Sequence, residues 1–173
     1  EFLDGSPFSA KSDVASPSSS EYYFDRVKVR SLAKKSNQRQ YPSPGCTGLF
    51  GWHTVPTDAD KIVLTEGEFD AMAVRQATGV PAVSLPNGCN SFPPALRPAL
   101  EPFSTIVLWM DSDSGGQAGA EKMARKLGIK RCVGVNSGED AKDANEALLK
   151  GLDLGAMIES AAPIPHEQIV EFD

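Results

Sequence analysis

Short apolar runs that alternate with segments of helical period constrain the fold of this chain more than any other feature. The runs cover residues 62–64, 82–85, 106–110 and 132–135, and nearly every position in them is apolar. Such runs are typical of strands that are buried on both faces of a sheet. The segments between them are long enough for helices that cross from one strand to the next. The pattern predicts an α/β fold with a mostly parallel four-stranded sheet flanked by helices.

Two of the connecting segments show an apolar face at helical spacing. In the first predicted helix, Phe69, Met72 and Ala73 share one face. A later helix is expected to end near Gly128, because a glycine can terminate a helix. Its apolar stripe consists of Ala120, Met123, Ala124 and Leu127.

Carboxylates follow two of the predicted strands at the point where each strand ends. Glu66 comes just after the first, and Asp111 and Asp113 come just after the third. The carboxyl ends of parallel strands meet at one edge of a sheet, where sites in such folds lie. Carboxylates at such short distances repel one another unless a cation lies among them. All-oxygen ligands favour a hard ion, so we expect Mg²⁺ or Mn²⁺ here.

Other interpretations of these acidic residues differ in how well they fit the sequence. An EF-hand loop that starts at Asp111 would place Lys122 where a glutamate is required, which excludes it. The glycines after Asp113 lack the spacing of a dinucleotide-binding loop. Capping of a helix start remains open for Asp113, and for Asp70 it is as good an interpretation as chemistry.

Three scattered cysteines do not form a zinc site. Cys46, Cys89 and Cys132 contain no C-x-x-C pair, and the chain has only His53 and His166 besides them. We therefore expect no zinc within this chain. An odd number of isolated thiols indicates ordinary buried or half-buried cysteines in a reducing compartment.

Charge is distributed unevenly along the chain. Residues 21–57 carry six basic and two acidic side chains, whereas residues 58–173 carry ten basic and eighteen acidic ones. A basic part therefore precedes an acidic part, as expected if one surface binds a polyanion and another binds metal cations.

The same patterns predict the domain organisation. Residues 1–20 are rich in Ser and Pro and are expected to be disordered. Residues 21–57 form a small basic subdomain and connector, with an alternating strand before residue 31. Residues 58–161 form the main domain, and residues 162–173 a linker. No apolar run approaches the length that spans a bilayer, so no membrane association is expected.

Several motifs resemble a known family. Glu-Gly-Glu after the first strand, Asp-x-Asp after the third and a downstream acidic segment resemble the TOPRIM domain of topoisomerases, DnaG-type primases and certain nucleases. The segments KDANEALLKG, GLFGWHTVP, RKLGIKRCVGV and LPNGCNSFPPAL resemble the primase half of phage T7-type primase-helicases and their mitochondrial relative Twinkle. The resemblance covers about residues 45–161 and implies a Rossmann-like TOPRIM fold.

The resemblance also implies an activity and a set of site residues. In such primases the residues that match Glu66, Asp111 and Asp113 are catalytic and hold Mg²⁺, and the match of Asp143 adds to the cluster. Glu66 is a general base or a pure ligand, and Glu68 and Asp70 contribute to a second metal. The implied reaction is metal-assisted nucleotidyl transfer that makes RNA primers from ribonucleoside triphosphates on single-stranded DNA.

The basic subdomain fits this interpretation by its charge. In related primases such a subdomain holds template and nucleotide, so its basic residues are candidates for phosphate contacts. They are Arg26, Lys28, Arg30, Lys34 and Lys35. Phe50 and Trp52 are either core residues or platforms for base stacking.

The chain also departs from the family. It has neither the zinc-binding cysteines of such primases nor the phosphate loop of their helicase half. The resemblance therefore implies a fragment, monomeric by itself, whose intact polypeptide includes a helicase domain, forms a ring and acts in mitochondria.

Two alternatives to primer synthesis remain. One is a noncatalytic single-strand-binding module of a Twinkle-type helicase, as in animal relatives with degenerate acidic motifs. The other is a TOPRIM nuclease or topoisomerase-like strand cleaver, for which Tyr22, Tyr23 and Tyr41 are poorly placed nucleophiles.

Overall fold

The computed structural model describes residues 27–31, 37–41, 48–89 and 92–165. The chain divides into two compact units, Glu1–Gly45 and Cys46–Asp173, and each is described by itself. Residues 46–57, assigned from the sequence to the connector, thus belong to the second unit.

The first unit contains a two-stranded antiparallel sheet of β1 (Val27–Arg30) and β2 (Gln38–Tyr41). Lys28 pairs with Gln40 and Arg30 with Gln38, so the two basic residues share one face of the sheet. Val27 and Val29 lie on the opposite face and are exposed. The predicted strand with a basic face is confirmed for its described part.

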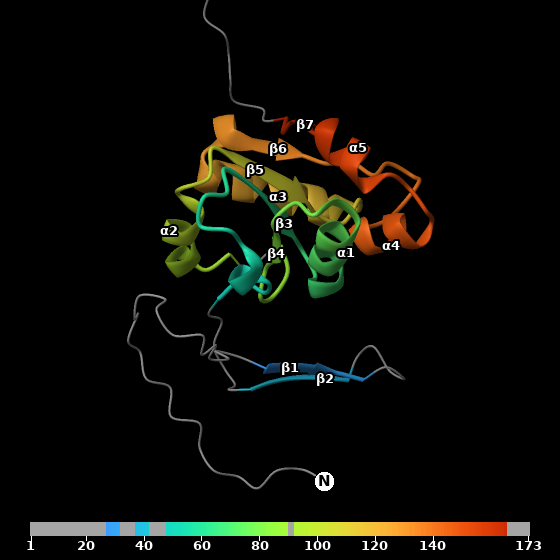
Figure 1. Ribbon diagram of the computed structural model, residues 1–173, viewed down its shortest axis with the longest axis horizontal. Helices are drawn as coiled ribbons and strands as arrows, with labels where there is room; N and C mark the ends of the chain where they lie inside the picture. The colour runs from blue at the N-terminus through green and yellow to red at the C-terminus, as the bar shows by residue number, and fades with distance from the viewer. Residues whose placement is uncertain (1–26, 32–36, 42–47, 90–91, 166–173) are drawn as a thin grey trace, which may run out of the picture. The chain divides into compact units, whose positions relative to one another are not determined.

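The second unit is built on a five-stranded sheet with the order β4-β3-β5-β6-β7 (Figure 1). Its four parallel strands are β3 (Lys61–Thr65), β4 (Ala82–Ser84), β5 (Thr105–Trp109) and β6 (Cys132–Gly134). These confirm the four predicted strands. A fifth, β7 (Ala162–Pro163), pairs antiparallel with β6 at the edge, within the stretch expected to be a linker.

Among the described residues of this unit, five α-helices cover the two faces of the sheet. They are α1 (Glu68–Thr78), α2 (Arg97–Leu100), α3 (Ser114–Leu127), α4 (Ala144–Leu149) and α5 (Leu154–Glu159). The 3₁₀ turns η1 (Trp52–Thr54), η2 (Pro94–Leu96) and η3 (Ile129–Arg131) complete the described elements. None of the described helices is long and apolar enough to cross a membrane.

The core consists of one apolar layer on each face of the sheet, because alternate strand residues point to opposite sides. Ile62 and Leu64 pack in the layer under α2 and α3, whereas Val63 packs in the layer under α1, α4 and α5. The chain runs from β3 to β4 with α1 on one face, and from β5 to β6 with α3 on the other. The neighbouring strands β3 and β5 therefore flank the point where the winding direction reverses, and in such folds ligands bind there at the carboxyl ends of the strands.

The predicted apolar face of the first helix is wrong for Phe69 and Met72 and confirmed for Ala73, whereas that of the later helix is confirmed. Phe69 and Met72 of α1 are exposed, and Ala71 and Val74 are buried instead. The helix starts at Glu68, which turns Phe69 away from the sheet and leaves a face of small residues against which α4 packs. In α3 the predicted stripe is buried and the helix ends at Gly128.

The segment before β3 extends the sheet edge without burying its aromatic rings. Phe50 exchanges two backbone hydrogen bonds with Ser84 of β4, each of 3.1 Å. Its side chain and that of Trp52 are exposed. The Trp52 ring contacts Phe103 edge-on, with 6.2 Å between ring centroids. The interpretation of these two aromatics as core residues is wrong.

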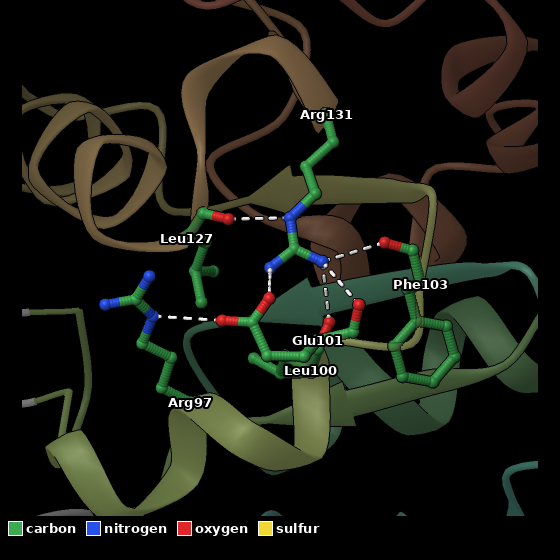
Figure 2. A network of polar contacts seen from close by, with 6 residues as sticks. All are labelled: Arg97, Leu100, Glu101, Phe103, Leu127 and Arg131. Carbon is green, nitrogen blue, oxygen red and sulfur yellow. Dashed lines mark hydrogen bonds and ion pairs between the residues drawn. The ribbon is translucent and has the colours of Figure 1, made fainter.

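Arg131 ties together the amino-terminal ends of β5 and β6 (Figure 2). Its guanidinium donates to the backbone carbonyls of Leu100, Phe103 and Leu127 at 3.0, 2.9 and 2.6 Å. It also forms an ion pair with Glu101 at 3.1 Å. These carbonyls end helices or precede a strand, so they lack intrahelical partners. Arg131 thereby braces the sheet edge opposite to its carboxyl ends.

Candidate functional site

Glu66 lies in the turn between β3 and α1, at the carboxyl edge of the sheet. Thr65 shapes this turn, because its hydroxyl donates to the carbonyl of Gly67 at 3.0 Å. Gly88, in the left-handed region at φ 79°, brings the loop after β4 against the carboxylate, and a Cβ there would lie 3.2 Å from Glu66 Oε1. The Oε2 atom of Glu66 is buried and has no hydrogen-bond partner among the described residues. A buried oxygen without a partner is costly unless a cation or donor approaches it.

Cys89 packs beside this carboxylate. Burial raises the pKa of its thiol to about 11, and a hydrogen bond to Glu66 adds to the effect. Gly119 of α3 permits the approach, since a Cβ there would lie 2.6 Å from Cys89 Cβ. Cys89 and Cys132 are free buried thiols, as the sequence predicted, and Cys46 lies outside the described residues.

Asp111 and Asp113 lie in the turn between β5 and α3. Asp113 caps the helix by accepting a hydrogen bond from the backbone N–H of Gly116 at 2.8 Å, so the capping interpretation holds for this residue. Gly116 packs directly on the Asp111 backbone, where a Cβ would lie only 2.1 Å from the carbonyl oxygen. Gln117 donates to the same carbonyl at 3.2 Å. The two aspartates are therefore held in a fixed tight turn.

Asp143 reaches the same edge from the segment before α4. Its Oδ1 accepts from the backbone N–H of Glu146 at 2.7 Å and caps that helix. The backbone N–H of Ser112 donates to the Lys142 carbonyl at 2.8 Å, which joins this segment to the turn that carries Asp111. Lys142 Nζ lies 2.7 Å from Asp111 Oδ2.

Asp70 connects α1 with α4 and is buried. It does not cap its own helix, whose N-cap is Gly67, although its carboxylate serves at the start of α4. Its Oδ1 accepts instead from the backbone N–H of Asn145 at 3.0 Å. Burial, together with the charges of Asp143 and Asp111, raises the pKa of Asp70 to about 6, against the effect of the Asn145 hydrogen bond. Carboxylates from three separate parts of the chain therefore influence one another at this edge.

The other predicted site residues have different positions. Glu68 is the first residue of α1 and is half-buried. Lys28 and Arg30 lie on β1 in the first unit. Arg26, Lys34 and Lys35 lie outside the described residues. Sequence analysis missed Lys142 and Cys89, although Lys142 directly precedes Asp143 in the KDANE segment.

The chemistry of these carboxylates fits a divalent cation, although they do not form a complete coordination shell. Across the described ranges, no three His, Cys, Asp or Glu side chains converge closely enough to enclose an ion. Their donors are all oxygen, and the buried Oε2 of Glu66 lacks a partner, as a site for Mg²⁺ or Mn²⁺ requires. Glu66, Asp111, Asp113 and Asp143 are the residues that could hold it, with Glu68 and Asp70 beside them.

Comparison with known proteins identifies the family. The Toprim-like family model matches residues 63–148. A primase homolog protein of Arabidopsis thaliana is 32% identical over 151 residues, which cover 70% of this chain and 42% of that protein. The chloroplastic/mitochondrial Twinkle homolog of the same plant is 31% identical over 130 residues, covering 58% of this chain and 17% of that protein. The chain thus spans less than half the length of these curated relatives.

Solved structures of the bacteriophage T7 system show the same fold. One match, with a TM-score of 0.69 at 30% identity, is a chain in a structure of the T7 lagging-strand DNA polymerase. In that structure the polymerase interacts with primase domains of two gp4 subunits bound to an RNA/DNA hybrid and dTTP. The match covers 79% of this chain and 70% of that one. The primase fragment of the T7 primase-helicase has a TM-score of 0.64 at 31% identity, covering 78% and 56%. This chain therefore belongs to the Toprim-like family, among the T7-type and Twinkle-like primases.

Proposed function

We propose that this chain is the catalytic core of a DNA primase, which joins ribonucleotides into short primers on a single-stranded DNA template. The observation that carries the proposal is the position of Glu66 and Asp111 just beyond the carboxyl ends of the neighbouring parallel strands β3 and β5, with one buried Glu66 oxygen lacking a partner among the described residues. The kinship with primases that act on nucleic acid and nucleotides supports the substrate class.

Different residues of the chain would have different roles in this reaction. Glu66, Asp111 and Asp113 would hold Mg²⁺ or Mn²⁺, with Asp143 beside them and Glu68 and Asp70 near a second ion. When bound, the ions activate the attacking 3′-hydroxyl and neutralise charge on the triphosphate. Glu66 either accepts the proton of that hydroxyl or serves as a ligand only. Lys28 and Arg30 would contact phosphates of the template or nucleotide from the first unit.

The intact protein is proposed to act beyond this unit. A helicase domain in the same polypeptide, a ring-shaped assembly and a mitochondrial location follow from the kinship with Twinkle proteins, one of which is named chloroplastic/mitochondrial. A noncatalytic single-strand-binding role is the second candidate. One observation favours it, since no three acidic side chains in the described ranges enclose an ion site.

Primer synthesis tests the proposal directly. The protein is incubated with single-stranded DNA, labelled ATP, the other ribonucleotides and Mg²⁺ or Mn²⁺. The variant Asp111→Ala/Asp113→Ala removes site carboxylates, and Glu139→Gln, at an exposed acid, is the matched control. Short labelled oligomers from the wild type and Glu139→Gln, but not from the double variant, are expected. Absence of product together with absence of Mn²⁺ binding by calorimetry would reject the catalytic role in favour of the accessory one.

A further inference from the structure

The ammonium of Lys142 lies where a metal ligand set is proposed. Lys142 Nζ is 2.7 Å from Asp111 Oδ2. The hydrogen bond and charge of Asp111 raise the pKa of Lys142, and the charges of Asp143 and Asp113 add to this. The ammonium therefore faces three of the carboxylates expected to hold Mg²⁺ or Mn²⁺.

The backbone of Lys142 is fixed, whereas its side chain is free to move. The Lys142 carbonyl accepts from Ser112 N–H at 2.8 Å, and the Lys142 N–H donates to Glu146 Oε2 at 2.8 Å. The side chain is 50% exposed, in contrast to 19% for that of Asp111. A flexible four-carbon stem on a fixed backbone lets the ammonium leave Asp111 without any change in the fold.

A divalent cation and this ammonium compete for one oxygen. A cation bound by Asp111 would lie within about 5 Å of the ammonium, where repulsion between a single and a double positive charge in water corresponds to about a tenfold change in affinity. The more strongly charged ion prevails, and the ammonium turns towards solvent at the edge where an anionic substrate would bind.

We propose that Lys142 is a displaceable counter-ion: it neutralises Asp111 while metal is absent, and once metal binds it swings out to contact the triphosphate of the incoming nucleotide. This inference rests on the proposed function, since it assumes a divalent cation and a nucleoside triphosphate at this edge. Lys142 is thus a binding residue whose partner changes with the metal, rather than a permanent structural ion pair.

Mn²⁺ affinity without nucleotide is the first measurement, made by calorimetry on the wild type, Lys142→Gln and Lys150→Gln. Lys150 is the matched control because it is a half-exposed lysine of the same region, paired with Glu146 at 2.9 Å rather than with Asp111. Lys142→Gln is expected to bind Mn²⁺ about tenfold more tightly than the wild type, and Lys150→Gln within about twofold of it. Equal affinity of the wild type and Lys142→Gln would overturn the inference while leaving the metal site intact.

Triphosphate affinity at saturating Mn²⁺ is the second measurement, made with a non-hydrolysable ATP analogue. Lys142→Gln is expected to bind it at least fivefold more weakly, whereas Lys142→Arg, which keeps the charge, is expected to retain most of the affinity. Tighter Mn²⁺ binding with unchanged analogue binding would overturn the triphosphate contact alone. A wild type that binds no Mn²⁺ would overturn the proposed metal site itself, so the failures of the two proposals are distinguishable.

Discussion

Replacement of Asp70 by asparagine is expected to stabilise the metal-free protein at neutral pH. Asp70 is buried, and its pKa is raised from 3.8 to about 6, chiefly by burial and then by Asp143 and Asp111. The folded state therefore prefers the protonated carboxyl, and its ionisation opposes folding. An amide at this position resembles the protonated acid: its oxygen can still accept from Asn145 N–H, and its NH₂ can donate towards Asp143.

The size of the effect follows from the shift in pKa. Below pH 3.8 Asp70 is protonated in both the folded and the unfolded state, so it does not lower the free energy of unfolding. As pH rises towards about 6 only the unfolded state ionises, so the wild type loses stability, and above pH 6 the loss is complete. A shift of about 2 units corresponds to about 3 kcal/mol. The Asn145 hydrogen bond, which favours the charged form, is already included in this net shift. Asp70→Asn should thus gain about 3 kcal/mol at pH 8.

Urea unfolding with EDTA at pH 3.5 and pH 8 measures this gain. The expected result is a difference near zero at pH 3.5 and a higher midpoint for Asp70→Asn at pH 8, with an unchanged slope. Asp140→Asn, at an exposed acid of the loop before α4, should behave as the wild type at both values. A gain that is independent of pH, or no gain at pH 8, would refute the argument that a buried charge at Asp70 destabilises the metal-free fold.

Three further predictions concern the packing around the site and its opposite edge. Gly116→Ala should destabilise the protein by about 3 kcal/mol in urea unfolding, because its Cβ would meet the Asp111 carbonyl oxygen at 2.1 Å. Gly115→Ala should destabilise it far less, because its Cβ would meet only the end of the Asp113 side chain, at 3.2 Å. Cys89 should react with iodoacetamide at pH 8 about 100-fold more slowly in the folded than in the unfolded protein, because a pKa of about 11 leaves little thiolate. Peptide-resolved mass spectrometry measures the two rates, and comparable rates would contradict the prediction. Arg131→Lys should lower the free energy of unfolding by about 2–4 kcal/mol, because an ammonium cannot donate to all the carbonyls that the guanidinium contacts in Figure 2. Mn²⁺ affinity should not change, and a loss of Mn²⁺ binding would show that the two sheet edges are coupled.

Local patterns in the sequence were sufficient to predict the four parallel strands and the edge at which Glu66, Asp111 and Asp113 lie. A strand buried on both faces is apolar along its length, and a carboxylate directly after it can only lie at the strand's carboxyl end. The position of β7 could not be predicted, since a two-residue strand containing proline has no periodicity and exists only through its pairing with β6. The buried face of α1 was predicted only in part, because it consists largely of alanines. Their burial depends on how closely α4 approaches.

Contacts between distant segments were equally invisible in the sequence. Asp70 stands in the first turn of α1, which is typical of a helix cap, yet its partner is the backbone of Asn145 on another helix. Lys142 and Asp111 meet only because the Ser112 N–H binds the Lys142 carbonyl and joins two loops. Cys89 approaches Glu66 only because Gly119 leaves room for it. In each case tertiary packing, rather than local preference, selects the partner.

The metal-free fold limits the repulsion between these carboxylates in two ways. Below about pH 6 Asp70 holds a proton, because its surroundings are buried and acidic. Asp111 takes the ammonium of Lys142 instead, because it lies closer to solvent, where a long cationic side chain can reach it. Glu66 Oε2 accepts a hydrogen bond from no donor among the described residues, so it is the position in the cluster where a divalent ion would gain most.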